Sequence, residues 1–407
     1  MGNKYYDVVI IGGGIHGVGV AQAAVAAGHS ALVLEQETLA CGTSSRSSKL
    51  IHGGLRYLEG MQISLVRECL RERALLLKNA PSLVKLQPFY IPVYKDTSRR
   101  PWLIRSGLML YSLLGGFNRA SLFRSLNKNK WNDLDGLDTI GLETVFRYYD
   151  AQTDDAALTR AVMHSAQSLG AELETHAQFI SGKLHNDGAT VQYKKNGATI
   201  TCNARTVVNA AGPWANQVLA HILPQQPPQA IDLVQGTHIV IDGTLKQGIY
   251  YMEAPSDRRA VFAMPWQGKI LVGTTETVFD ATADPTTVRP LEEEAHYLMK
   301  TVASYFPEYR NLQTNPICNA FAGLRVLPRA ANSSNTPFAR PRETILQTDR
   351  DDCPRLLTIY GGKLTAYRAT AEKCLKRLKP SLPERKAIAN TRSLPLHEIP
   401  LSCEDTD

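Results

Sequence analysis

A glycine-rich turn between an apolar strand and a small-residue helix constrains this chain more than any other feature. Residues 7–11 are a short, β-branched apolar run typical of a buried strand, and a G-x-G-x-x-G spacing follows at once. Residues 21–27 are alanine-rich and predict a helix, and residues 31–34 predict a second strand. This order of elements is that of a βαβ unit that binds a dinucleotide. The chain should therefore contain an α/β layer with parallel strands.

Each glycine of this turn has a separate task. Gly12 permits the tight turn, Gly14 lets backbone N–H groups approach a pyrophosphate, and Gly17 lets the helix pack on the strand. Ile15 begins the helix, whose N-terminus supplies partial positive charge for the phosphates. Glu35 ends the second strand and is placed to accept hydrogen bonds from a ribose hydroxyl. The unit alone does not distinguish NAD from FAD.

Composition limits the class of protein and its compartment. The chain has 407 residues and 43% hydrophobic residues, which suits two domains or one large domain with a sizeable core. Its net charge of +7 fits an anionic substrate, an acidic membrane surface or nucleic acid. Seven scattered cysteines without a C-x-x-C pair indicate neither a disulfide framework nor a metal site, and they fit a reducing compartment. We expect no signal peptide and no spanning helix.

A loop rich in hydroxyl side chains follows the second strand. Residues 43–48 crowd threonine and serine beside the cation Lys49, and His52 precedes a second glycine pair. This composition suits neither a core nor a helix, but apolar residues at 50–51 and 55–58 anchor the segment on both sides. We therefore expect an ordered loop rather than a solvated linker.

The next segment contains a strand pattern and an apolar helix. Residues 86–94 are strand-like but contain Pro88 and Pro92, and proline is confined to sheet edges, so an edge strand is expected. Residues 101–114 predict a strongly apolar helix that is too short to span a bilayer. With arginines around it, the helix either lies in the membrane interface or forms core beneath a sheet, and the sequence favours neither.

The second half continues the α/β pattern and adds a second sheet. Residues 154–210 predict a helix with an aspartate N-cap, an antiparallel meander and a return strand. Residues 231–276 predict long antiparallel strands that suit a substrate-binding sheet. Residues 355–360 predict the last strand, and the glycine turn that follows opens a final helix. The tail at 380–407 either drapes over the surface or is disordered.

Six motifs occur in a recognisable order along the chain: Gly12-x-Gly14-x-x-Gly17, 43–59, 236–240, 273–275, 323–325 and 361–365. In this order they resemble FAD-dependent glycerol-3-phosphate dehydrogenases of the D-amino-acid-oxidase-like flavoprotein superfamily. The resemblance extends from about residue 6 to residue 379, and the motif at 43–59 is its most specific part. It implies FAD, a substrate-capping sheet, membrane association and a quinone acceptor.

The resemblance implies an α/β fold with a Rossmann-like FAD-binding domain of the glutathione-reductase type and an inserted antiparallel β-sheet substrate domain. We expect the FAD-binding domain at 1–80, 145–228 and 316–379, the substrate or cap domain at 81–144 and 229–315, and a C-terminal tail at 380–407. Two departures stand out. Such dehydrogenases usually carry a further helical domain, whereas 28 residues follow Lys379 here. Residues 326–329 also replace a typically acidic stretch.

Oxidation of a phosphorylated secondary alcohol requires cations for the phosphate and a base for the hydroxyl proton. Arginine forks match phosphate oxygens bidentately. The resemblance implies that Arg56, Arg325, Arg340 and Lys363 lie at the flavin's substrate face, and we expect Tyr57 and His238 to contact the substrate as well. An alternative to Arg340 is Arg342, and any of the arginines could instead form a surface salt bridge.

The proton and the flavin anion require further groups. His238 leads as the base because a histidine pKa suits proton transfer near neutrality, with a satisfied core histidine as the alternative and His52 as the rival. Lys363 follows two glycines at a helix start, where N–H groups can face flavin N1 and C2=O. The expected catalytic residues are His238, Arg325 and Lys363. The expected cofactor-binding residues are Gly12, Gly14, Ile15, Gly17, Glu35, Thr43, Ser44, Ser45, Ser47, Ser48, Lys49, His52, Gly53, Gly212, Gly361, Gly362, Lys363, Leu364 and Thr365.

These observations lead to a predicted reaction: FAD-dependent oxidation of sn-glycerol 3-phosphate to dihydroxyacetone phosphate, with hydride transfer to flavin N5. Electrons would pass to quinone at the inner face of the cytoplasmic membrane, or less favourably to oxygen. The alternatives are an oxidase or dehydrogenase of another small 2-hydroxy or amino acid, and a non-catalytic flavin-binding subunit. An anionic membrane surface is an expected partner, nucleic acid is not, and a homodimer is compatible with the resemblance.

Overall fold

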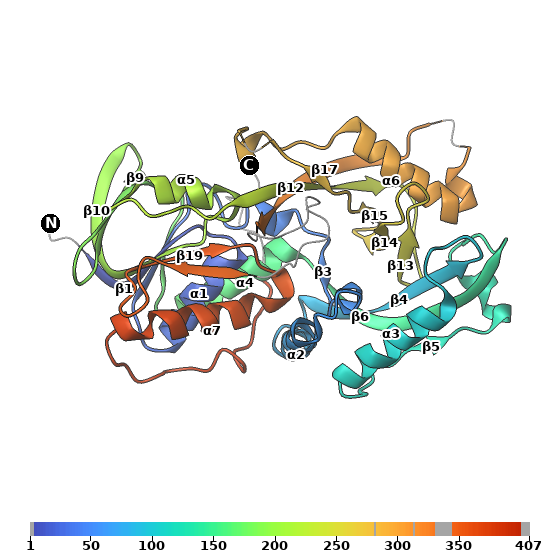
Figure 1. Ribbon diagram of the computed structural model, residues 1–407, viewed down its shortest axis with the longest axis horizontal. Coiled ribbons are helices and arrows are strands. Elements are labelled where there is room, and N and C mark those ends of the chain that lie inside the picture. The colour runs from blue at the N-terminus through green and yellow to red at the C-terminus, as the bar shows by residue number, and fades with distance from the viewer. Residues whose placement is uncertain (1–3, 281, 312–313, 330–343, 400–407) are drawn as a thin grey trace.

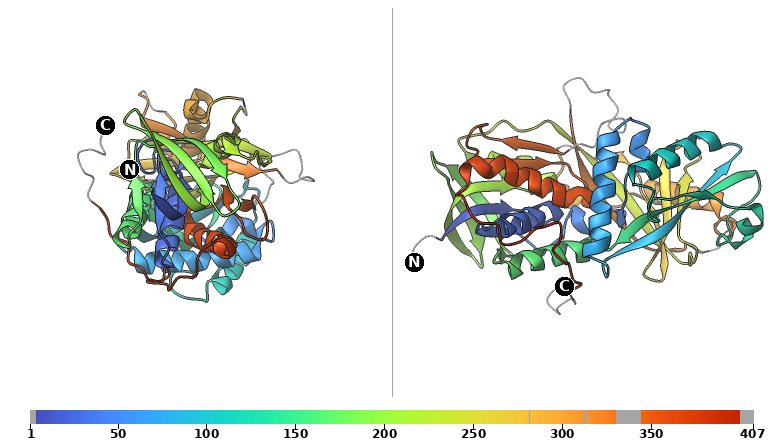
Figure 2. Two further views of the ribbon diagram at one scale, coloured as in Figure 1. Left: turned by 90° about the vertical axis from the view of Figure 1, so that its left-hand side faces the viewer. Right: turned by 90° about the horizontal axis from the view of Figure 1, so that it is seen from below.

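Two sheets lie end to end along the long axis of the molecule. The computed structural model describes residues 4–280, 282–311, 314–329 and 344–399. In Figure 1 the first sheet, which contains β1 and β10, lies on the left, and the second, which contains β12 and β4, lies on the right. Helix α2 (Ile63–Asn79) crosses between the two halves (Figure 2, right).

The first sheet has nine strands and contains the expected βαβ unit. Its spatial order is β11 (Ile222–Leu223), β8 (Gln178–Leu184), β9 (Ala189–Lys195), β10 (Ala198–Asn209), β1 (Tyr5–Ile11), β2 (Ala31–Leu34) and β7 (Glu172–Glu174), with β19 (Leu356–Tyr360) beside the second half of β10 and β18 (Ile345–Thr348) outside β19. Strand β1 pairs in parallel with both β2 and β10. This confirms the two predicted strands and the return strand.

Alternation along β1 builds the two cores of this sheet. Val8 and Ile10 face a cluster with α1 (Ile15–Ala26), α4 (Asp155–Ser168) and α7 (Tyr367–Leu378). Val9 and Ile11 face the opposite cluster, formed with the β8–β9–β10 meander and α5 (Ala215–Ala220). Because successive side chains of a strand point to opposite faces, the apolar run at 8–11 contributes to both cores. Asp154 caps α4 as expected, accepting from the Ala157 N–H at 2.9 Å.

The second sheet has ten strands and is antiparallel at every pairing except one. Its order is β16 (Thr277–Val278), β12 (Ile231–Ile241), β15 (Lys269–Gly273), β14 (Ala260–Trp266), β13 (Ile249–Glu253), β4 (Val84–Tyr94), β6 (Leu142–Thr153) and β3 (Leu50–Ile51), with β17 (Ile317–Pro328) on β12 and β5 (Arg124–Ser125) on β6. The exception is the parallel pair β4–β13. Helix α6 (Glu292–Tyr305) packs on this sheet. The architecture is thus the predicted α/β fold with a second, substrate-type sheet.

The position of β4 corrects one expectation. Its two prolines predicted an edge strand, but β4 lies inside the sheet between β6 and β13. It pairs with β13 only at Phe89 and Tyr90, so Pro88 and Pro92 flank this short contact instead of interrupting it. The sheet also includes β17 and most of β6, which come from segments expected for the FAD-binding domain. The domain boundaries themselves stay a prediction.

The apolar helix α3 (Pro101–Leu114) has two different faces. Leu108, Tyr111 and Ser112 are buried, which establishes a core role for the inner face. Trp102 and Met109 are 68% and 59% exposed on the outer face. Among the described residues, no helix combines the length and apolar character that crossing a membrane requires. An interfacial role of the outer face stays a proposal.

The described part of the tail drapes over the first sheet's helices. The N–H groups of Ile388 and Ala389 donate to the carbonyl of Ala26, and the Leu396 N–H donates to the carbonyl of Asn79 at 2.7 Å. Leu396 is itself buried in the helix-side core. Residues 380–399 therefore confirm the draping alternative, and residues 400–407 lie outside the described chain.

Candidate active site

A cavity of about 950 Å³ joins the two sheets. Its walls come from the glycine turn after β1, the loop at 43–59, the turn after β19 and the paired strands β12 and β17 of the second sheet. At its far end it reaches α3, where Leu103, Ile104 and Leu110 line it. The carboxyl ends of parallel strands are where ligands bind in open α/β sheets, so this position is expected for a nucleotide.

The glycine turn forms a backbone cradle that side chains would fill. Gly12 has a φ of +109°, and a Cβ placed on it would lie 2.7 Å from the Ala210 carbonyl oxygen. A Cβ on Gly17 would lie 1.9 Å from the carbonyl oxygen of Gly12. The Ile15 N–H, at the start of α1, donates to Ser44 Oγ at 2.9 Å. These features fit a pyrophosphate at a helix N-terminus.

Glu35 is fixed beside this cradle. One of its carboxylate oxygens accepts the Gly13 N–H at 2.6 Å and the other accepts the Glu37 N–H at 2.9 Å. The side chain is buried, yet it lines the cavity. Backbone donors thus hold the carboxylate where the βαβ unit predicts a ribose, and ribose binding stays a prediction.

The loop at 43–59 is ordered by a buried ion pair. Lys49 Nζ lies 2.5 Å from Asp155 Oδ1, and the other oxygen of Asp155 accepts the Ser47 N–H at 2.9 Å. The ammonium also lies 5.4 Å from the ring centroids of Trp266 and Phe321. Burial raises the pKa of Asp155, and the lysine opposes that effect. The contacts of Lys49 therefore connect the loop to α4 and the second sheet.

The cavity brings together most of the predicted site residues. Those that line it are Gly12, Gly14, Ile15, Glu35, Thr43, Ser44, Ser47, Ser48, His52, Arg56, Tyr57, Gly212, His238, Arg325, Gly361, Gly362, Lys363, Leu364 and Thr365. Four others do not line it, namely Gly17, Ser45, Lys49 and Gly53. Arg340 lies outside the described residues. The predicted set is therefore one spatial cluster, although its roles are predictions.

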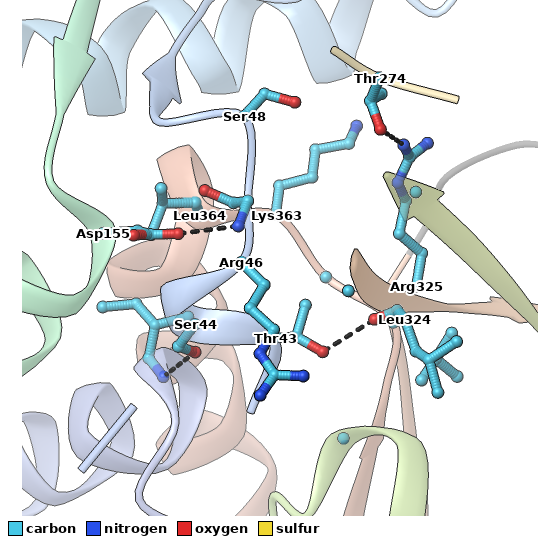
Figure 3. Close-up of a pocket in the computed structure, with 18 of the residues that line it drawn as sticks. Thr43, Ser44, Arg46, Ser48, Asp155, Thr274, Leu324, Arg325, Lys363 and Leu364 are labelled. Atoms are coloured by element: carbon cyan, nitrogen blue, oxygen red, sulfur yellow. Dashed lines mark hydrogen bonds between the residues drawn. The ribbon is translucent and has the colours of Figure 1, made fainter. Parts of the chain in front are cut away.

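Arg325 and Lys363 form a cationic end of the cavity. On β17, Arg325 donates through Nη1 to Glu276 Oε1 at 2.7 Å and through Nη2 to Thr274 Oγ1 at 3.2 Å. Lys363 follows the glycine turn after β19, and its ammonium lies 4.0 Å from the ring centroid of Tyr57. Figure 3 shows the side chains of Arg325 and Lys363 extending toward the same end of the cavity. This end suits an anionic group.

His238 is held neutral in this environment. It is buried on β12, shares a 2.9 Å hydrogen bond between Nε2 and Ser48 Oγ, and stacks on Phe321 with the ring centroids 5.0 Å apart. Burial lowers the pKa of His238 to about 3, helped by the positive charges of Arg325 and Lys49. An ordinary histidine pKa was the reason for its predicted role, so that reason does not hold. His52 binds Thr365 through its backbone N–H.

Sequence reasoning missed several cavity residues. Glu276 lines the cavity and pairs with Arg325. It directly follows the 273–275 motif, so its position in the sequence could have identified it as a cavity residue. Arg259 and Arg99 line the cavity from segments without a motif. His16 lies inside the glycine motif, and burial lowers its pKa to about 4. Only the folded chain brings these side chains to one cavity.

The fold and the cradle define the class of protein. A family model described as "FAD dependent oxidoreductase" matches residues 7–368. The chain belongs to this family of FAD-dependent oxidoreductases, within its glycerol-3-phosphate dehydrogenase branch, and FAD is its cofactor. It is 38% identical over 380 residues to the glycerol-3-phosphate dehydrogenase of Pseudomonas aeruginosa, covering 93% of this chain and 72% of that protein.

Two further similarities show how far the family assignment extends. The D-erythritol 1-phosphate dehydrogenase of Brucella abortus is 35% identical over 382 residues, covering 93% of this chain and 74% of that protein. The structure of the glycerol-3-phosphate dehydrogenase from Bacillus halodurans complexed with FAD superimposes with a TM-score of 0.75 at 27% identity, covering 97% of this chain and 68% of that one. The family therefore includes relatives named for different polyol phosphates.

Proposed function

We propose that this chain oxidises sn-glycerol 3-phosphate to dihydroxyacetone phosphate. One observation carries the proposal: a nucleotide cradle and the cationic end formed by Arg325 and Lys363 share a single cavity, which Arg56 also lines. The curated relatives named glycerol-3-phosphate dehydrogenase support the same substrate. FAD supplies the hydride-accepting chemistry when bound, while the protein binds, orients and shields the substrate.

The phosphate is held by the cationic end. Arg325 presents a guanidinium fork whose orientation is fixed by Glu276 and Thr274. A fork matches two phosphate oxygens, whereas the Lys363 ammonium acts as a point charge. Arg325 therefore sets the orientation of the phosphate, and Lys363 adds positive charge beside it. Binding and orientation are therefore separate tasks of these side chains.

The hydroxyl proton goes to His238. The imidazole is neutral at physiological pH, so one ring nitrogen has a lone pair, and the Ser48 hydroxyl fixes the ring's orientation. Its basicity is low in the ligand-free protein, partly because Arg325 is near. A phosphate bound to Arg325 offsets that positive charge and raises the pKa of His238. Substrate binding would thus make the base stronger when the proton is released.

The electron acceptor is a quinone reached from the membrane. Leu103 and Leu110 of α3 line the cavity, and Trp102 and Met109 on the same helix are exposed. An apolar helix with one face on the cavity and another on the surface suits an apolar acceptor in a bilayer. We accordingly propose a peripheral position on the inner face of the cytoplasmic membrane.

A second candidate substrate is a longer polyol phosphate. The relative named D-erythritol 1-phosphate dehydrogenase supports it, since it resembles this chain almost as closely as the glycerol-3-phosphate dehydrogenases do. Both substrates require the same phosphate site and differ by one carbinol unit. The reaction class is unaffected by this choice.

Anaerobic loss of flavin absorbance tests the proposal. The purified protein is mixed with glycerol 3-phosphate, erythritol 1-phosphate, lactate or proline in separate reactions. We expect glycerol 3-phosphate to bleach the flavin at the lowest concentration. Faster bleaching by erythritol 1-phosphate would favour the second candidate. Bleaching by lactate or proline alone would assign a hydroxy acid or amino acid substrate, and no bleaching would favour a non-catalytic subunit.

A further inference from the structure

Glu276 lies between two arginines at the cationic end of the cavity. Its Oε1 accepts Arg325 Nη1 at 2.7 Å, and its Oε2 lies 3.7 Å from the Arg259 guanidinium. Arg259 Nη1 also donates to the backbone carbonyl of Glu276 at 3.0 Å. All three residues line the cavity. One carboxylate thus sets the relative position of two guanidinium groups.

Arg259 is anchored independently on its other side. Its Nε donates to Asp257 Oδ2 at 2.7 Å, and Asp257 accepts the Tyr297 hydroxyl at 2.9 Å. The side chain remains 29% exposed, close to the 25% of Arg325, whereas that of Glu276 is 5% exposed. The two guanidinium groups are therefore accessible from the cavity while the carboxylate that connects them is covered.

The donors of this triad point to its ligand. Arg325 and Glu276 alone sum to zero, so Lys363 supplies the net positive charge of this end, whereas a phosphate carries close to two negative charges. Arg259 is itself paired with Asp257, so it adds a second guanidinium group on the same cavity rather than net charge. Phosphate groups are bound best where several charge-assisted donors converge. A second arginine is therefore what the Arg325–Glu276 pair lacks.

We propose that Arg259 is a second phosphate ligand and a specificity-determining residue for phosphorylated polyols. This inference rests on the proposed function, because it assigns a residue to the same phosphate. Glu276 acts as a positioning residue that holds the two forks at a fixed separation. A substrate with a single negative carboxylate would use Arg325 alone and gain less from Arg259.

The chain offers a matched control in the adjacent arginine. Arg258 donates to the Asp96 carbonyl at 2.9 Å, is about half exposed and does not line the cavity. Arg259→Gln and Arg259→Lys are compared with Arg258→Gln for flavin content, melting temperature, kcat, KM and competitive inhibition by inorganic phosphate. The phosphate ion probes the anion site without the polyol.

We expect Arg259→Gln to raise KM for glycerol 3-phosphate and the phosphate inhibition constant by roughly tenfold or more, with a smaller change in kcat and normal flavin content. Arg259→Lys should recover part of the loss, and Arg258→Gln should match the wild type. An unchanged KM or phosphate inhibition constant in Arg259→Gln overturns the assignment. Loss of flavin in both Arg259 variants also overturns it, since the arginine would then be structural. Failure of the wild type to oxidise any phosphorylated polyol would instead refute the proposed function.

Discussion

The two ends of the cavity are built in different ways. At the nucleotide end, Gly12 and Gly17 belong to one turn, and their backbone atoms approach so closely that a Cβ would collide. At the cationic end, Arg325 lies on β17, and its partners Glu276 and Arg259 lie in the loops next to β15 and β14. The first site depends on local backbone geometry, and the second on how segments far apart in sequence pack together. One short motif indicates the whole of the first site, whereas the motifs indicated Arg325 of the second but neither Glu276 nor Arg259.

The largest effect should come from the nucleotide end. In Gly17→Ala, the new Cβ would lie 1.9 Å from the Gly12 carbonyl oxygen, which has no room to move because β1 is central to its sheet. We expect loss of FAD and of most folded protein, measured by flavin absorbance and thermal unfolding. Gly60→Ala is the control, because its nearest contacts would lie 3.8 Å away. A yellow, stable Gly17→Ala protein would show that the turn is not the cradle.

A smaller and more selective effect should come from the cationic end. Arg325→Ala should lower kcat/KM for glycerol 3-phosphate by about tenfold to a hundredfold, because a charge-assisted contact contributes about 1.5–3 kcal/mol. Flavin content should stay normal, which separates this end from the other. Arg325→Lys should restore activity only in part, since a point charge cannot replace the fork. An unchanged kcat/KM in the alanine variant would remove Arg325 from the site.

Each end also contains one buried, neutral histidine, and this makes acid stability a further test. Burial lowers the pKa of His16 to about 4, from an ordinary 6.5. As pH falls from about 6.5 toward 4, the unfolded chain binds a proton that the folded chain does not, so stability falls. At about pH 5 this costs about 2 kcal/mol for His16. His238 also lowers the free energy of unfolding at acid pH, because its pKa in the folded chain is about 3.

Denaturant unfolding near neutral and near acid pH measures this contribution. In His16→Asn we expect the loss of stability between about pH 7.5 and about pH 5 to shrink by about 2 kcal/mol relative to the wild type. Equal losses in the two proteins would mean that His16 is protonated or solvated when folded. For the reaction, His238 should add no ionisation to the kcat/KM profile between about pH 5 and 8, because it is already neutral there.

The smallest effect should be found on α3, where the membrane proposal can be tested. Met109 is exposed and Leu108 next to it is buried. A charge at Met109 therefore tests contact with lipid, whereas a charge at Leu108 tests packing in the core. Trp102→Glu with Met109→Glu should release the protein from anionic vesicles while it keeps its flavin. Leu108→Glu should unfold the protein, because it buries an unpaired charge. Each basic residue near the surface contributes about 1 kcal/mol, so binding should weaken with salt.

Co-sedimentation with vesicles at several salt concentrations gives the measurement. Equal sedimentation of the wild type and the double variant, or no wild-type binding to anionic lipid, would contradict an interfacial role for α3. The outer face of the helix would then need another explanation.

Much of the nucleotide end was predictable from sequence. The strand at 7–11, the tight turn at Gly12 and the aspartate N-cap at residue 154 depend on local periodicity, on a residue that favours a positive φ and on a side-chain hydrogen bond to a nearby N–H group. The cavity also contains most of the residues that the motifs indicated. These features share one property, namely that neighbours in sequence determine them.

Other features could not be predicted, for physical reasons. Lys49, which we expected among the cofactor-binding residues, does not line the cavity and is buried against Asp155, a partner far away in sequence. The prolines of β4 predicted an edge strand because local pattern does not show how short the contact with β13 is. The low pKa of His238 follows from burial and from Arg325, which only the folded chain brings near. Each of these depends on long-range packing.

The most direct test of the account is the rate at which glycerol 3-phosphate bleaches the flavin in a single anaerobic turnover, with hydrogen or deuterium at C2. If the cationic end holds the phosphate so that the C2 hydrogen is transferred within the same cavity, deuterium should slow bleaching several-fold. Equal rates for the two isotopic forms, or no bleaching by either, would contradict the account.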